Sequence, residues 1–151
     1  MCILSKVIIR QLGEVYYSEA LKAMQTFTEC RHSDTCDEIW LLQHPPVFTL
    51  GRNGKDEHVL VETDIPIVQS DRGGDITYHG PGQVIAYVLI DLKRRKQGVR
   101  QLVNSLVDVV IKFSLNSDFA GRHHDCFSNN LMIGETSFFS RRGINFCCIT
   151  F

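Results

Sequence analysis

The chain has 151 residues, of which 44% are apolar and 22% are charged, a balance typical of a globular domain with a buried core. The formal net charge of −1 gives no general reason to expect nucleic acid as a partner. No run of residues approaches the roughly 18 apolar positions that a membrane helix requires, which excludes a membrane-spanning segment within this sequence.

The first half of the chain alternates between strand and helix patterns. Residues 6–10 predict a strand, and Ser18 is placed to cap a helix that runs to about Cys30. Four residues of this helix share one apolar face at the 3.6-residue spacing: Ala20, Leu21, Met24 and Phe27. Three short strands are then predicted over residues 38–43, 47–50 and 65–69.

The second half begins with the strongest strand pattern in the chain. Residues 83–92 are apolar on both faces, which predicts a strand in the middle of a sheet. A helix follows Gly98 and carries a single apolar stripe: Val99, Leu102, Val103, Leu106, Val109, Val110 and Phe113. Beyond residue 113 neither periodicity persists, and only Leu131–Ile133 and Phe138–Phe139 indicate short strands.

The composition also changes near residue 112. Every valine and every lysine lies at or before Lys112, whereas seven of the nine phenylalanines lie in residues 113–151. We therefore interpret the chain as a single domain, residues 1–151, whose last part, residues 113–151, is a divergent tail that arose either by a frameshift or by ordinary sequence change. The N-terminus lacks the features of a signal peptide, so we expect a cytoplasmic protein with reduced cysteines.

The chemical signal is concentrated in residues 71–83, which we predict to be a loop between two strands. Four glycines between Gly73 and Gly82 allow close approach of the backbone to a ligand. Arg72 and His79 add a cation and a titratable group, a combination that suits a carbonyl or thioester oxygen, a carboxylate or a phosphate. The alternative is a hairpin whose glycines only make turns. The loop is neither a Walker A sequence nor a dinucleotide fingerprint.

This loop resembles a known family. Arg72-Gly73-Gly74, followed by Thr77-Tyr78-His79-Gly80-Pro81-Gly82-Gln83, is similar to the signature loop of the lipoyl (octanoyl) transferases. The resemblance is continuous over about residues 6–112. It includes the segments Asp37-Glu38-Ile39-Trp40-Leu41, His44-x-Pro46-Val47-Phe48-Thr49, Asp64-Ile65-Pro66 and Leu92–Arg100.

The resemblance implies an α/β fold, with a mixed sheet and flanking helices like that of the lipoate and biotin protein ligases. It also implies an acyltransferase that moves octanoyl from acyl carrier protein, through an enzyme cysteine, to a lysine. The acceptors would be the lipoyl domains of 2-oxoacid dehydrogenases and the H protein of glycine cleavage. No metal, nucleotide or other cofactor is needed, because the thioester is already activated.

By the same resemblance the substrate-binding residues are those that line the acyl pocket: Arg72, Gly73, Gly74, Asp75, Ile76, Thr77, Tyr78 and His79. The catalytic pair, however, falls in the divergent part. The family's catalytic lysine aligns with Met132, which has no proton to exchange, and its cysteine nucleophile falls beyond Phe151. The alternative to an octanoyltransferase is therefore an inactive, truncated copy that at most binds acyl groups.

Two further groups of residues have open interpretations. Cys147 or Cys148 could replace the nucleophile, and His123, His124 and Cys126 could supply a base or a metal ligand, but their spacing matches no zinc pattern. The run Lys93-Arg94-Arg95-Lys96 either docks the acidic surface of a partner or forms a solvated turn.

Overall fold

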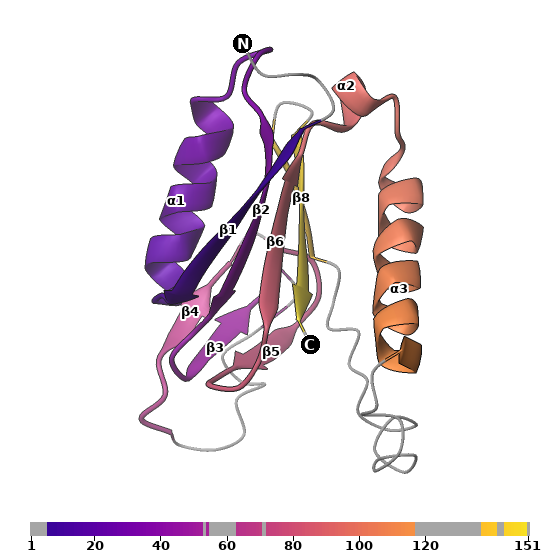
Figure 1. Ribbon diagram of the computed structural model, residues 1–151. Coiled ribbons are helices and arrows are strands. Elements are labelled where there is room, and N and C mark those ends of the chain that lie inside the picture. The colour runs from indigo at the N-terminus through magenta and orange to yellow at the C-terminus, as the bar shows by residue number, and fades with distance from the viewer. Residues whose placement is uncertain are drawn as a thin grey trace.

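A computed structural model describes residues 6–52, 54, 63–70, 72–116, 137–141 and 144–150. These residues form a five-stranded sheet, a three-stranded sheet and three helices (Figure 1). The predicted α/β class with a mixed sheet and flanking helices is confirmed.

The five-stranded sheet has the order β1-β2-β6-β8-β7. Its strands are β1 (Val7–Glu14), β2 (Asp37–Gln43), β6 (Ile85–Ile90), β8 (Ile144–Thr150) and β7 (Ser137–Arg141). β1 runs parallel to β2, and the other pairs are antiparallel. All six residues of β6 are buried, which confirms the central strand that the two-sided apolar pattern predicts.

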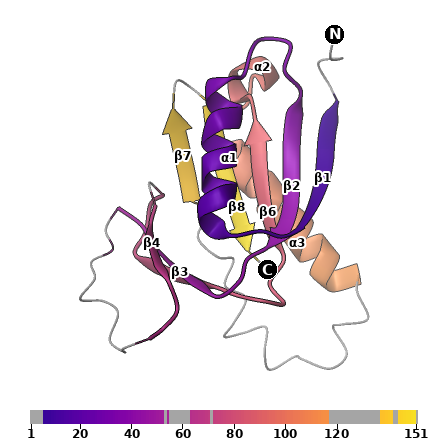
Figure 2. The ribbon, with the colours of Figure 1, turned by 90° about the vertical axis from the view of Figure 1, so that its left-hand side faces the viewer.

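The second sheet has three strands in the order β4-β3-β5 and lies beyond one end of the larger sheet (Figure 2). They are β3 (Val47–Leu50), β4 (Ile67–Gln69) and β5 (Ile76–His79). β5 corrects the sequence prediction, which treated residues 71–83 as one loop. Because Ile76–His79 pair with β3, Thr77, Tyr78 and His79 are held by a ladder of backbone hydrogen bonds.

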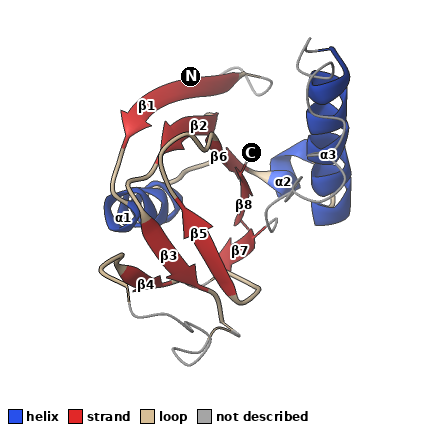
Figure 3. Ribbon diagram, turned by 90° about the horizontal axis from the view of Figure 1, so that it is seen from below, coloured by secondary structure: helices blue, strands red, loops and turns tan. Residues whose placement is uncertain are grey.

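Helices cover both faces of the five-stranded sheet (Figure 3). On one face α1 (Tyr17–Glu29) packs Ala20 and Met24 against residues of β2 and β6 that include Trp40 and Tyr87. On the other face, α2 (Leu92–Arg95) and α3 (Val99–Asn116) pack Leu92 and Leu102 against Val88 and Ile90 of β6.

Several predicted details of the helices and strands were wrong. The N-cap of α1 is Tyr16, which makes no capping hydrogen bond with its side chain, and Ser18 lies inside the helix. β1 continues to Glu14, because Gly13 adopts a positive φ of 69° where the register with β2 shifts. The apolar stripe of α3 is only partly buried, since Val109 is 62% exposed.

The tail also contains more regular structure than its sequence pattern indicates. β7 includes the predicted strand at Phe138–Phe139, but β8 was not predicted at all. β8 forms because Ile144–Thr150 pair along the edge of β6, and this pairing satisfies backbone groups without needing a regular side-chain period.

No helix among the described residues is long and apolar enough to cross a membrane. Cys36 is disulfide-bonded, which corrects the prediction that all cysteines are reduced, whereas Cys30 is free and exposed.

Candidate functional site

Residues 72–75, the glycine-rich segment, lie against the end of β3 and the two residues that follow it. The N–H of Gly51 donates to the Asp75 carbonyl at 2.6 Å, and the N–H of Arg52 donates to the Arg72 carbonyl at 2.9 Å. A Cβ at Gly51 would lie 2.4 Å from the carbonyl oxygen of Gly74, so only glycine permits this approach. Gly74 itself has a φ of 78°, in the region that favours glycine.

The guanidinium of Arg72 holds this segment from inside. Its side chain is buried, and it donates to the carbonyl oxygens of Thr49 (2.6 Å), Gly73 (2.9 Å) and Asp75 (3.0 Å). It also donates to the hydroxyl of Thr49. The cation that the sequence offers to a ligand is therefore engaged by the segment's own backbone, where it neutralises several carbonyl dipoles.

His79 is the last residue of β5 and belongs to a group of buried rings, the ring group, whose other members are Tyr17, His44 and Tyr87. It is 4% exposed, stacks on Tyr17 at 6.1 Å between ring centroids, and meets His44 edge-on at 5.8 Å. Burial lowers the pKa of His79 to about 4, with further lowering from His44 and Arg72 and a partial offset from Gln83. The imidazole is therefore neutral at pH 7, and its Nδ1 has no hydrogen-bond partner among the described residues.

His44 is fully buried, and its hydrogen bonds define its tautomer. Nδ1 lies 2.6 Å from the carbonyl oxygen of Val15, which can only accept, so Nδ1 carries the proton. Nε2 then accepts from the hydroxyl of Tyr87 at 2.8 Å. Burial lowers the pKa of His44 as well, which favours this neutral form. On the other side of the group, the hydroxyl of Tyr17 donates to that of Ser70 at 2.8 Å.

The structure divides the predicted site residues into two sets. Arg72, Gly73, Gly74 and Asp75 form the segment over Gly51, and Thr77 and His79 share the inner face of β5. Tyr78 lies on the opposite face with Phe48, at 5.3 Å between rings, and is 43% exposed. By strand alternation Ile76 shares the face of Tyr78.

Sequence reasoning missed three members of the ring group: Tyr17, His44 and Tyr87. Each comes from a different part of the chain, and they meet because α1 and the connection between β2 and β3 lie against β6. The available signal was His44 itself, a histidine in the His44-x-Pro46 segment, since a buried histidine requires polar partners.

Several other candidates lie outside the described residues: Met132, His123, His124 and Cys126. For Cys147 and Cys148 only the backbone is described; Cys148 lies in register with Tyr87, and Cys147 with Val88. Within the described part of the chain, no group of three or more His, Cys, Asp or Glu residues is arranged to hold a metal ion.

The chemical character of this region follows from these contacts. The imidazoles of His44 and His79 are neutral and the tyrosine rings are uncharged, whereas Arg72 keeps its positive charge while it donates to backbone carbonyls. Neutral rings suit an apolar ligand group, and a nearby guanidinium suits a carbonyl oxygen or an anion.

The chain is similar to known proteins of one family. The family model of the lipoyl protein ligase A/B catalytic domain matches residues 16–149. An octanoyltransferase of Klebsiella pneumoniae is 60% identical over 107 residues, which cover 71% of this chain and 50% of the relative. An octanoyltransferase of Aliivibrio fischeri is 45% identical over 145 residues, which cover 93% of this chain and 64% of the relative.

Solved structures show the same fold. Lipoate-protein ligase A bound with ATP superposes with a TM-score of 0.64 at 11% identity, covering 96% of this chain and 66% of that one. A bipartite lipoate protein ligase from Thermoplasma acidophilum gives 0.62 at 12% identity, covering 96% and 60%. The chain spans about half the length of the first curated relatives that it matches.

Proposed function

This chain belongs to the lipoyl protein ligase A/B catalytic domain family, and from that premise we propose that it takes part in octanoyl transfer to lipoyl domains. The donor would be the thioester of octanoyl-acyl carrier protein, and the acceptor a lysine of a lipoyl domain. The observation that carries the proposal is the 60% identity to an octanoyltransferase over 107 residues. The glycine-rich segment and the ring group both lie in the part of the chain that resembles the family, residues 6–112.

The site residues of this proposal are a subset of the predicted ones. The octanoyl chain would contact the Gly73-Gly74 backbone, Thr77 and His79. Arg72 would hold the backbone of the segment in place through its hydrogen bonds to carbonyl oxygens. The neutral ring of His79 suits an apolar acyl group, and its Nδ1 can hydrogen-bond the thioester carbonyl when that nitrogen carries the proton. Tyr78 lies on the other face of β5, where it packs on Phe48, so it would not contact the octanoyl chain in this region.

The chemistry needs two balanced steps. A cysteine thiolate attacks the thioester carbonyl, and the carrier's thiol leaves with the acyl group now bound to the enzyme. The lysine amine then attacks this second thioester, an amide forms, and the enzyme thiol is released. Cys148 is a nucleophile to test, because its backbone is in register with Tyr87 of the ring group.

Mass spectrometry of the intact proteins tests the proposal. The chain is incubated with octanoyl-acyl carrier protein and an apo lipoyl domain, and each protein is weighed. Octanoyl transfer adds about 126 Da to the lipoyl domain, and a covalent intermediate adds the same mass to the enzyme. A lipoyl domain whose mass does not change after complete incubation contradicts the proposal.

One observation favours a second function, acyl binding without transfer. By the sequence resemblance Met132 aligns with the family's catalytic lysine, and a thioether neither stabilises a thiolate nor carries a proton. In that case the chain binds octanoyl-acyl carrier protein, but neither protein gains mass. The variant Met132→Lys would then raise the rate of acylation relative to the natural sequence.

A further inference from the structure

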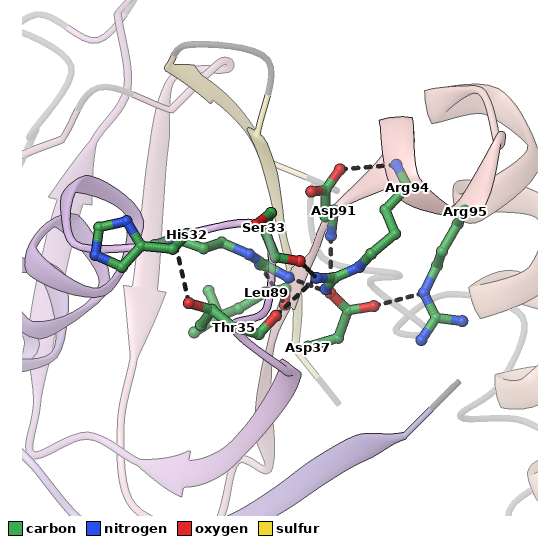
Figure 4. A network of polar contacts seen from close by, with 9 residues as sticks. His32, Ser33, Thr35, Asp37, Leu89, Asp91, Arg94 and Arg95 are labelled. Atoms are coloured by element: carbon green, nitrogen blue, oxygen red, sulfur yellow. Dashed lines mark hydrogen bonds and ion pairs between the residues drawn. The ribbon is translucent and has the colours of Figure 1, made fainter. Parts of the chain in front are cut away.

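The basic run Lys93-Arg94-Arg95-Lys96 is divided between the interior and the surface. Asp37, at the start of β2, is 1% exposed and accepts from Arg94 at 2.5 Å and Arg95 at 2.6 Å (Figure 4). It also pairs with Arg31 and accepts from the backbone N–H of Asp91 at 3.0 Å. Burial raises the pKa of Asp37, but these hydrogen bonds outweigh it and hold the pKa below its ordinary value.

Arg94 also ties α2 to the loop before β2. Its guanidinium donates to the carbonyl oxygens of Ser33 at 3.0 Å and Thr35 at 2.8 Å. The short helix is capped by Asp91, whose carboxylate accepts from the N–H of Arg94. α2 is therefore held as a rigid platform at the end of β6, although it has only four residues.

The remaining cations of this platform face solvent. Lys93, Lys96 and Arg100 are exposed, and Arg95 keeps 27% of its side chain exposed beside Asp37. Three guanidiniums here lie beside two carboxylates, the buried one of Asp37 and the capping one of Asp91, so the cluster keeps a net positive charge below the surface cations. Asp34 is the exposed carboxylate of the neighbouring loop and offsets only part of this excess.

We propose that α2 and the start of α3 form the docking surface for the acyl carrier protein, with Lys93, Lys96 and Arg100 contacting carboxylates of the carrier. This inference rests on the proposed function. Positive charges that are held in fixed positions attract an acidic partner and orient it before contact.

Distance favours the carrier over the lipoyl domain as the occupant. Tyr87, in the ring group, and Asp91, before α2, are four residues apart along β6, about 13 Å at the usual rise of a strand. A partner docked on α2 must therefore deliver its reacting group on a long arm. The carrier holds its thioester on a flexible arm that begins with a phosphodiester, whereas the acceptor offers only a lysine side chain.

The test compares two double variants with the same change of charge. K93E/K96E alters the platform, and K22E/K112E alters exposed lysines on α1 and near the end of α3. Calorimetric titration with acyl carrier protein at low salt should show binding weakened roughly tenfold or more for K93E/K96E and less than about twofold for K22E/K112E. Thermal unfolding of each variant confirms that it is folded.

A second measurement separates this inference from the proposed function. Octanoyl-pantetheine carries the thioester without a protein surface, so transfer from it should be equal in the natural chain and in K93E/K96E. Equal affinity of both double variants for the carrier overturns the docking surface while transfer still occurs. Loss of lipoyl-domain binding in K93E/K96E, with carrier binding intact, also overturns it. Absence of transfer from either donor in the natural chain contradicts the proposed function instead.

Discussion

At Gly51 the space beyond the α-carbon is filled by the carbonyl oxygens of Gly73 and Gly74. The variant Gly51→Ala would place a methyl group 2.4 Å from one of them, so the segment above must move. We expect a loss of roughly 1–3 kcal/mol in the free energy of unfolding, together with weaker octanoyl binding. Urea denaturation and titration with octanoyl-acyl carrier protein measure the two effects.

The matched control for this prediction is Gly73→Ala in the same segment. A Cβ at Gly73 meets nothing within 4 Å, and its φ is not positive, so stability should change by less than about 1 kcal/mol. Similar destabilisation of both variants would mean that chain stiffness, and not the close approach at Gly51, determines the effect.

His79 makes stability depend on pH. In the folded chain its pKa is lowered from 6.5 to about 4, so between these values the unfolded state binds a proton that the folded state does not. The free energy of unfolding is therefore greatest above pH 6.5 and falls as the pH approaches 4, by at most about 3 kcal/mol from this residue. Urea denaturation at a series of pH values gives the slope.

The variant His79→Gln isolates that contribution. Its slope between pH 7 and 5 should be shallower than that of the natural chain, whatever its absolute stability. The slope that remains is assigned to His44 and, near pH 5, to Asp37 and Glu38, whose pKa values are also lowered by folding. An unchanged slope would show that His79 does not titrate between its folded and unfolded values in this range.

At the scale of elements, α2 depends on one side chain of its basic run. Arg94→Met removes hydrogen bonds to Asp37, Ser33 and Thr35, whereas Lys93→Met changes an exposed neighbour. We expect a loss of roughly 2 kcal/mol for Arg94→Met and less than about 0.5 kcal/mol for Lys93→Met. Chemical denaturation of the pair checks this difference, and equal losses would mean that Arg94 does not anchor the helix.

The same contacts describe the basic run more closely than either interpretation of the sequence. It is neither a fully solvated turn nor a uniform patch of four cations. Arg94 and Arg95 neutralise a buried carboxylate, and Lys93 and Lys96 remain exposed for a partner. Sequence alone does not make this division, because Asp37 is more than fifty residues away along the chain.

At the scale of the whole molecule, β7 and β8 complete the main sheet. β8 pairs with β6 from Ile85 to Ile90, and β6 is buried throughout. Removing residues 117–151 would leave the inner edge of an apolar strand unpaired. We expect this shortened chain to associate and to lose its cooperative thermal transition. Size-exclusion chromatography and thermal unfolding check this, and a monomer with an unchanged transition would contradict the role of β8.

Much of the fold could be predicted from local pattern. β6 was located by its two-sided apolar run, and the apolar face of α1 by its 3.6-residue spacing, because burial selects those periods directly. β8 could not be found in this way. Its residues Ile144–Thr150 show no sustained period, and they form a strand because the edge of β6 supplies hydrogen-bond partners.

By itself, the sequence determined the family resemblance and the mixed α/β class, and it predicted a site at residues 72–79, because glycines and a signature loop are local features. Only the tertiary structure decided what those side chains do. It turned Arg72 inward onto carbonyls, brought Tyr17 and His44 to His79, placed Tyr87 against His44, and assigned Arg94 and Arg95 to Asp37. The physical reason is that burial makes polar groups find partners, and those partners come from distant parts of the chain.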